Sequence, residues 1–295
     1  MPIDNPITSA LDLLRSSSPI PITTPQGRLS LSPTAVIANI TNAQIVHYLP
    51  YEGSIIPLWD RDMDRWVYRQ IPDAGVSHNI GNANPGIFDI YAGLNSSAAG
   101  FFTATQGWSS ATARFRPLTR KDGIWVLDFG GDDYRLYLGT VQTTGAAGSA
   151  RMQDDLNQRL LFNGWNQIPR RVQRFDPALS WQYAGASWRN QNNSAANRIN
   201  IVDGFGTAML DLTLSSRAAA PAGSIAESGM GWDASPTPSE GYNASFPGDL
   251  TLSTRIARRF GSPGAHFVQI CERVSGGGTV TFYGNYLGLQ GLYFC

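Results

Sequence analysis

The residues best suited to bind a metal stand in one short acidic run. Asp60, Asp62 and Asp64 alternate with other residues, which is how a calcium-binding loop begins. Such a loop continues with a glycine and ends with a bidentate glutamate at its twelfth position, but these places hold Arg65 and Ile71. The run therefore predicts a hairpin turn with solvated carboxylates, and we expect no metal site.

Nucleophilic catalysis needs a base beside a serine or a cysteine. The chain has three histidines, His47, His78 and His266, and no serine lies in a G-x-S-x-G sequence. His47 and His266 fall in predicted strands, where packed histidines are ordinary. The glycine runs at 229–231 and 276–278 also lack the following helix that a nucleotide site needs. We expect no catalytic residue and no cofactor.

Paired carboxylates are harder to judge, because two acids at the correct separation are enough to hydrolyse a glycosidic bond. No sequence rule pairs the six candidates, which are Asp89, Asp122, Asp128, Glu227, Glu240 and Glu272. A glycan-cleaving enzyme therefore stays open as an alternative function.

Aromatic side chains offer a second route to glycans, because their faces stack on the apolar faces of sugars. Most of the eight tryptophans lie in or beside predicted strands and are expected in the core. Trp232 and Tyr242 instead flank a long polar segment, 232–247, which we predict to be a surface loop. These two residues are our candidates for a ligand or subunit contact.

Composition excludes several classes of partner. The 295 residues carry 22 basic and 22 acidic side chains, so the net charge is zero and nothing attracts nucleic acid or a membrane surface. Lys121 is the single lysine, which favours planar arginine contacts or reflects a GC-rich genome. No apolar run predicts membrane insertion or a signal peptide. Cys271 and Cys295 match no metal or disulfide spacing, which fits assembly in the cytoplasm.

The first residues differ from the rest. Asp4 or Asn5 can cap a short helix whose apolar stripe includes Ile7, Leu11 and Leu14. Such a helix is too short to be stable alone in water, so we expect it to dock on another surface. Docking on its own domain is the alternative to anchoring the protein on a partner.

Short alternating segments bounded by glycine, proline, asparagine and aspartate fill most of the chain, which is typical of β-sandwiches and jelly rolls. They predict strands over 28–32, 44–49, 55–59, 65–71, 86–92, 100–105, 123–129, 135–143, 179–187, 197–202, 207–215, 224–232, 250–256, 266–274 and 279–283.

One internal segment has helical spacing instead. Met152, Leu156 and Leu160 lie four residues apart, and we predict a helix over 151–165. The predicted fold is all-β, with two β-sandwich or jelly-roll-like domains joined by this helix and a short N-terminal anchoring segment. The domains would span 1–26 (anchor peptide and linker), 27–148 (first β domain), 149–170 (connecting helix) and 171–295 (second β domain).

Several phrases of the sequence occur together in one known family. They are Gly27-Arg28-Leu29-Ser30-Leu31, the phrase from Tyr48 to Trp59, Trp108 with Thr112-Ala113-Arg114, Asp122-Gly123-Ile124-Trp125-Val126, Tyr137-Leu138-Gly139-Thr140, Trp165-Asn166-Gln167-Ile168-Pro169-Arg170, Asn192-Asn193-Ser194-Ala195-Ala196-Asn197-Arg198 and the segment from Gly276 to Gly284. In this order they resemble tailed-bacteriophage virion surface proteins, which are structural proteins of fibres, tails and head surfaces. The resemblance covers roughly 27–291.

The resemblance implies a structural protein on the outside of a virion, assembled in the bacterial cytoplasm and non-enzymatic. It would be a fibre-like appendage or adhesin, held to tail or head by its N-terminal segment and binding other virion proteins. A homo-oligomer, typically a trimer, and a host-surface glycan as receptor fit this expectation. The alternatives are a capsid decoration protein that stabilises capsomers and a glycan-cleaving enzyme like those of tailspikes, although such enzymes are usually longer β-helices.

Overall fold

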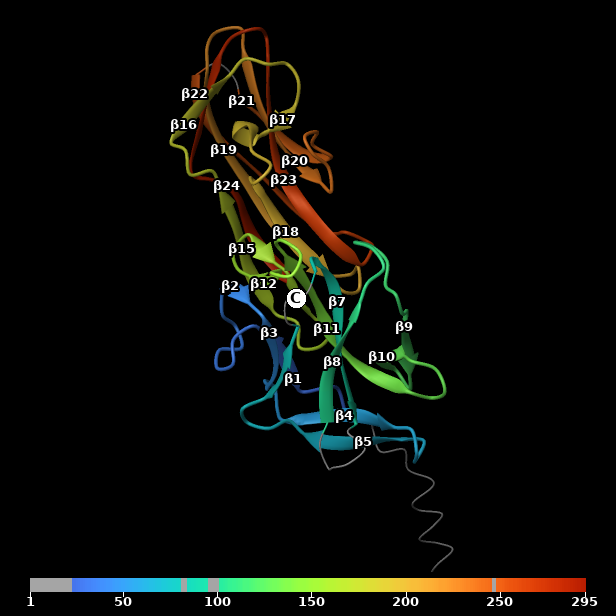
Figure 1. The fold of residues 1–295 in the computed structure, drawn as a ribbon. Coiled ribbons are helices and arrows are strands. Elements are labelled where there is room, and N and C mark those ends of the chain that lie inside the picture. The colour runs from blue at the N-terminus through green and yellow to red at the C-terminus, as the bar shows by residue number, and fades with distance from the viewer. Residues whose placement is uncertain (1–22, 81–83, 95–100, 246–247) are drawn as a thin grey trace, which may run out of the picture.

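The computed structural model describes residues 23–80, 84–94, 101–245 and 248–295 (Figure 1). In these ranges the chain forms strands and contains no α-helix. The strands up to the middle of the chain are β1 (Gly27–Ser30), β2 (Ile40–Ala43), β3 (Ile45–Pro50), β4 (Ile55–Asp60), β5 (Arg65–Gln70), β6 (Val76–Asn79), β7 (Gly86–Leu94), β8 (Phe101–Gly107), β9 (Leu118–Lys121), β10 (Ile124–Asp128) and β11 (Tyr134–Thr144).

The remaining elements include one short 3-10 helix, η1 (Gln191–Asn193). The strands are β12 (Arg151–Asp154), β13 (Gln158–Arg159), β14 (Leu161–Asn163), β15 (Pro169–Phe175), β16 (Ser180–Tyr183), β17 (Arg189–Asn190), β18 (Arg198–Asp203), β19 (Met209–Ala220), β20 (Ile225–Trp232), β21 (Glu240–Ser245), β22 (Gly248–Arg259), β23 (Gly264–Ser275) and β24 (Val280–Phe294). The all-β class predicted from the sequence is confirmed.

The largest sheet has fourteen strands and runs through both halves of the sequence. Its main path is β21-β20-β23-β18-β13-β12-β11-β10-β9, with β2, β7, β8, β14 and β17 paired beside it. The halves join where β13 pairs in parallel with β18, Gln158 opposite Asn200. The molecule is elongated, with the β4–β5 hairpin at one end and β16, β21 and β22 at the other (Figure 1).

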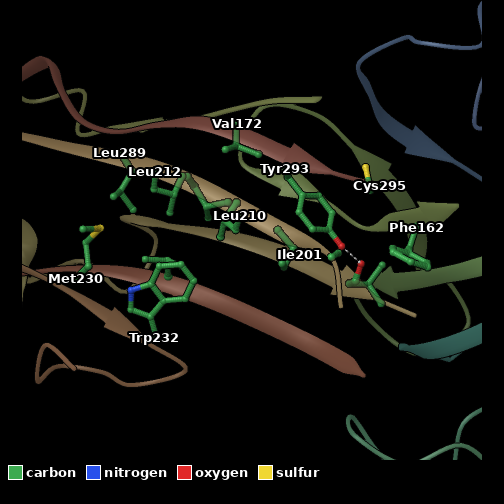
Figure 2. Packing of buried hydrophobic residues seen from close by; sticks show 14 of the residues in the cluster. Phe162, Val172, Ile201, Leu210, Leu212, Met230, Trp232, Leu289, Tyr293 and Cys295 are labelled. Atoms are coloured by element: carbon green, nitrogen blue, oxygen red, sulfur yellow. Dashed lines mark hydrogen bonds between the residues drawn. The ribbon is translucent and has the colours of Figure 1, made fainter. Parts of the chain in front are cut away.

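A second sheet, β15-β24-β19-β22 with β16 beside β24, packs on part of the large sheet. Apolar side chains from both sheets fill the space between them, among them Leu212 and Leu289 from one and Ile201 and Met230 from the other (Figure 2). Tyr293 is fully buried there and donates a hydrogen bond from its hydroxyl to the Val202 carbonyl, at 2.7 Å. This half is therefore a β-sandwich.

The other half has its own apolar cluster, built around strands near the β4–β5 hairpin. Leu29, Tyr48, Ile56, Leu58 and Leu138 are all buried in it. They come from the three-stranded sheet β1-β3-β6, from the hairpin and from β11. The anchor residues Ile7, Leu11 and Leu14 lie outside the described residues, and the four predicted domain ranges stay a prediction.

The predicted helix over 151–165 is wrong. The segment forms β12, β13 and β14 instead. Asp155 Oδ1 accepts hydrogen bonds from the amides of Asn157 and Gln158, both at 3.0 Å, and this Asx turn competes with a helix. The residues after it pair with β11 and β18, so sheet pairing overrides the local apolar spacing.

The structure also tests two loop predictions. The turn at 60–64 is confirmed: Asp60 Oδ1 accepts from the amides of Asp62 and Met63, at 3.0 and 3.1 Å. The segment 232–247 is not all loop, because β21 pairs with β20 there. No helix in the described ranges is long and apolar enough to span a membrane. Cys271 and Cys295 are free and buried, and burial raises the pKa of each thiol to about 12.

Candidate functional site

Side chains from two of the eight sequence phrases named above, 108–114 and 137–140, meet in the middle of the molecule. Arg114, from the loop after β8, donates to Asp89 of β7 from Nε at 2.8 Å and from Nη2 at 3.3 Å. Thr140 of β11 donates its hydroxyl to the other side of the same carboxylate, at 2.7 Å to Oδ1. Asp89 is 1% exposed, so this pair is in the core.

Aromatic rings enclose this pair. The Arg114 guanidinium lies over the Trp108 ring, 4.3 Å from its centroid. The Tyr137 hydroxyl is 2.6 Å from the Thr140 hydroxyl, and Arg114 also donates to the Gly204 carbonyl. Trp108, Arg114, Tyr137 and Thr140 all belong to the family phrases. We call Asp89, Trp108, Arg114, Tyr137 and Thr140 the buried lock.

The 165–170 phrase bonds both to the lock and to the first strand through its side chains. Trp165 donates its indole N–H to the Tyr137 carbonyl at 2.6 Å. Asn166 donates to the Gly27 carbonyl at 2.8 Å, and Arg28 donates to the Cys295 carbonyl at 2.9 Å. The first strand, the centre and the last residue of the chain are thus tied together.

Gly139 is required within the same phrase. A Cβ on Gly139 would collide with the Phe162 carbonyl oxygen of β14 and with the Leu29 side chain. The β7–β11 register also shifts at Leu138, between Tyr137 and Gly139, which is a β-bulge. The glycine therefore lets two backbones approach where the bulge turns Tyr137 and Thr140 toward the lock.

The electrostatics of the lock are those of a buried ion pair. Burial raises the pKa of Asp89 above its ordinary value, while the Arg114 charge and the donors Arg114 and Thr140 oppose that rise. Both carboxylate oxygens accept hydrogen bonds from side chains of the fold, so the group holds three chain segments together.

A second buried cluster contains another of the sequence phrases named above. Glu272 of β23 is 1% exposed and accepts from Trp181 at 2.9 Å, from Arg189 at 2.7 Å and from the Asn192 amide at 3.1 Å. Asn192 also donates to Asp176 at 3.2 Å, and Asn197 donates to the same carboxylate. The phrase from Asn192 to Arg198 is a turn held by two buried acids.

The other acids suggested for glycan hydrolysis lie apart from one another. Asp122 accepts from the Trp66 indole at 3.0 Å, Asp128 accepts from the Gly130 amide at 2.7 Å, and Glu227 accepts from Arg273 at 2.9 Å. The side chain of Glu240 is outside the described part. In the described part of the chain no hydrogen bond joins two of these acids, and each acid whose side chain is described is bonded to another part of the fold.

Two histidines have partners that the sequence did not reveal. His47 Nδ1 lies 2.8 Å from Ser77 Oγ across the β3–β6 pair. His266 Nδ1 lies 2.8 Å from Asp233 Oδ2, and its Nε2 lies 2.8 Å from the Ser262 carbonyl. Sheet pairing brings His47 beside Ser77 and His266 beside Asp233, although 30 or more positions separate the two residues of each pair in the sequence. A local motif therefore cannot reveal these contacts.

The structure places Trp232 in the core rather than on a free loop. It is 7% exposed and lies among the core residues (Figure 2). Its ring centroid is 5.1 Å from that of Phe260. Little of its ring is left for a ligand or a subunit, because β20 continues as far as Trp232 and turns it inward. Tyr242 lies on β21 opposite Gly229, and its side chain is outside the described part.

A surface cleft of about 420 Å³ lies at the hairpin end of the molecule. Trp59 and Arg69 line it from β4 and β5, and Phe102 lines it from β8. Tyr134 and Arg135 line it from the start of β11. Sequence reasoning missed this site, because its residues come from three separate segments.

Comparisons with known proteins give no family. No family profile matches the chain, and no curated protein matches it. Among solved structures, it is similar to one of infectious bursal disease virus, at 13% identity and TM-score 0.29, over 96% of this chain and 79% of that one.

Two further structures are similar at still lower scores. A glycoside hydrolase family 43 arabinoxylan arabinofuranohydrolase from Bacillus subtilis has 12% identity and TM-score 0.20, over 92% of this chain and 69% of that one. A carbohydrate-binding module of the β-sandwich superfamily has 15% identity and TM-score 0.17, over 90% and 98%. These scores are too low to bear on function.

Proposed function

We propose that this protein is a non-enzymatic structural component on the exterior of a tailed-bacteriophage virion, acting as a fibre-like appendage or adhesin. It is attached to tail or head through its N-terminal segment and forms a homo-oligomer, with a trimer as the expected state. Its two halves correspond to jelly-roll-like units in this proposal.

The observation that carries the proposal is the convergence of the family phrases. Trp108 and Arg114 belong to one phrase, Tyr137 and Thr140 to another, and Trp165 to a third, yet their side chains bond to one another's segments. Three of the eight phrases thus contribute to one buried cluster. Their contact is what a fold shared with the resembling proteins would require.

The residues of the lock suit a structural role. A buried arginine–carboxylate pair enclosed by rings fixes three segments in one arrangement, and its polar atoms also bond to Thr140 and to the Gly204 carbonyl. A surface protein that must keep its shape outside a cell needs such fixed connections more than it needs mobile catalytic groups.

Purified phage particles test the proposal. Antibody-labelled electron microscopy should find the protein on the particle exterior, and quantitative mass spectrometry should find it in few copies, as for an appendage. A copy number close to that of the capsid protein would favour the decoration alternative. Absence from purified particles would overturn the proposal.

Incubation with host polysaccharide tests the enzyme alternative. The proposal expects chains of unchanged length after prolonged incubation with the purified protein. Shortened chains, prevented by replacement of Asp122 or Glu227, would show that the protein cleaves glycans.

A further inference from the structure

We infer that the cleft between the β4–β5 hairpin, β8 and the start of β11 binds a neutral saccharide. The inference rests on the proposed host-attachment role for its biological meaning and names the ligand class for that role.

The charges of the cleft cancel. Its lining contains the carboxylates of Asp60, Asp62 and Asp133 and the guanidinium groups of Arg61, Arg69 and Arg135. Arg135 is paired with Asp133 at 2.7 Å, so this guanidinium and this carboxylate already neutralise each other. A strongly charged ligand gains little here, whereas a neutral ligand with many hydroxyl groups meets donors and acceptors side by side.

Two buried donors beside the cleft have no partner. In the described part of the chain, neither the indole N–H of Trp59 nor Nε of Arg69 has a hydrogen-bond acceptor. Trp59 is 7% exposed. Both atoms are enclosed by the protein, so the polar groups that a ligand in the cleft reaches are the exposed ones of the lining, among them Arg61 and Asp62. Sugar hydroxyl groups accept from a guanidinium and donate to a carboxylate.

Aromatic surface is present at the same place. Tyr134 and Phe102 are each only partly buried and both line the cleft. The Trp59 ring supports Tyr134 edge-on, with centroids 5.9 Å apart, and the Lys121 ammonium lies over the Trp59 ring at 4.3 Å. Lys121 also lies over the Tyr134 ring at 5.2 Å, and Arg135 lies over the Phe102 ring at 5.6 Å, so the aromatic surface offered to a sugar is the part of these two rings that stays exposed.

The size of the cleft is also suitable. Small-molecule sites are usually clefts of roughly 300–1,000 Å³ lined by aromatic groups and a few placed polar groups. At about 420 Å³ this cleft is at the lower end of that range, which suits one or two sugar rings of a longer chain.

Isothermal titration of the full-length protein with defined tetrasaccharides tests the inference. The neutral probes are maltotetraose, cellotetraose and mannotetraose, and the charged comparisons are tetragalacturonate and fully deacetylated chitotetraose. We expect at least one neutral probe to bind and the charged probes to bind more weakly.

Three variants locate the binding. Tyr134→Ala removes a ring that faces the cleft and should weaken binding about tenfold, the effect expected from losing one main contact. Asp62→Ala should weaken binding severalfold without affecting folding, because its side chain is 92% exposed. Phe115→Ala removes a residue that is 65% exposed and does not line the cleft, and should bind as the unmodified protein does.

The results separate this inference from the proposed function. No binding of any neutral probe, binding only of a charged probe, or equal binding by Asp62→Ala and Phe115→Ala would each overturn the saccharide site. Incorporation into particles is measured independently, so a protein that is on the virion but binds no sugar contradicts only the cleft inference. Sugar binding by a protein absent from particles contradicts only the proposed function.

Discussion

Arg114 holds Asp89 with two hydrogen bonds, at 2.8 and 3.3 Å, although 25 residues separate them in the sequence. The arginine comes from a loop and the aspartate from β7, and neither position looks like half of a pair in the sequence. Trp108 and Tyr137 cover the guanidinium with their rings. The pair explains why Trp108, Arg114 and Tyr137, which come from separate segments of the sequence, lie together in the fold.

Arg114→Ala should destabilise the protein strongly. It leaves the Asp89 carboxylate buried without its main partner, and breaking a buried pair in this way typically costs about 3–5 kcal/mol of unfolding free energy. Urea unfolding followed by tryptophan fluorescence measures the change. The control is Arg255→Ala, whose pair with Asp211 lies at the surface and should matter little. Equal midpoints for the two variants would contradict the structural role of the lock.

Gly139→Ala should disturb the join between β11 and β14. The added Cβ would lie against the Phe162 backbone carbonyl, which belongs to a paired strand and cannot move aside easily. We expect a large loss of soluble protein or a clear fall in melting temperature. Gly107→Ala is the matched control, because its Cβ would meet only ordinary contacts of 3.7 Å or more with Phe88. If both variants melt alike, the close approach at Gly139 is not required.

His266 should make stability depend on pH. Both of its ring nitrogens face acceptors, so the imidazolium form satisfies both bonds. Burial alone lowers the pKa of His266, but the hydrogen bonds to Asp233 and Ser262 and the charges of Asp233 and Asp203 outweigh burial, and its pKa lies above the ordinary 6.5. The resulting stabilisation is complete below the unfolded-state pKa and is lost as pH rises through the folded-state pKa.

Unfolding free energies measured from pH 5.5 to pH 9 check this expectation. The unmodified protein should lose stability above about pH 6.5, the ordinary histidine pKa. In His266→Gln this part of the pH dependence should disappear, while His78→Gln serves as the control and keeps it. A stability that is flat across this range in the unmodified protein would refute the role of His266.

The sequence predicted the all-β class because glycine, proline, asparagine and aspartate mark the turns between strands, and this local signal agrees with how the strands pair. It failed at 151–165, where Met152 and Leu160 have helical spacing. Met152 instead pairs with β11 and β2, and Leu160 forms backbone hydrogen bonds with Gln142 and Gln153. It also missed that β24 extends to Phe294, because Gly284, Gly288 and Gly291 resemble turn signals. Gly291 instead lies where a Cβ would collide with the Asp211 backbone on β19. Pairing between distant segments leaves no local trace.

The candidate site was less predictable than the fold. Trp59 and Tyr134 were not singled out as ligand residues, since strand tryptophans usually belong to the core and the two lie 75 positions apart. Trp232 was chosen because it flanks a polar segment, but the segment forms β21 and the ring is buried. The arginine-rich composition has a structural counterpart, because guanidinium groups lie over rings at Trp108, Trp125 and Tyr183.

Removal of residues 1–20 should leave the fold intact and abolish attachment to the virion. The contacts described above begin at Pro25, whose carbonyl accepts from Asn166 at 3.0 Å, so truncation before that point leaves them all in place. The melting temperature should therefore change little. Each apolar side chain of the stripe Ile7, Leu11 and Leu14 contributes about 1.5–3 kcal/mol when it is buried on a partner, so particles should lose the truncated protein.

A triple variant separates the stripe from the length of the segment. Ile7→Ala, Leu11→Ala and Leu14→Ala together keep the chain length and remove the apolar face, and should abolish incorporation as the truncation does. Thr8→Ala, Ser9→Ala and Asp12→Asn change the opposite face and should incorporate normally. Mass spectrometry of particles from infected cells measures all of these proteins against the capsid protein. If the truncated protein incorporates at the normal level, attachment must use the β-sheet part of the molecule instead.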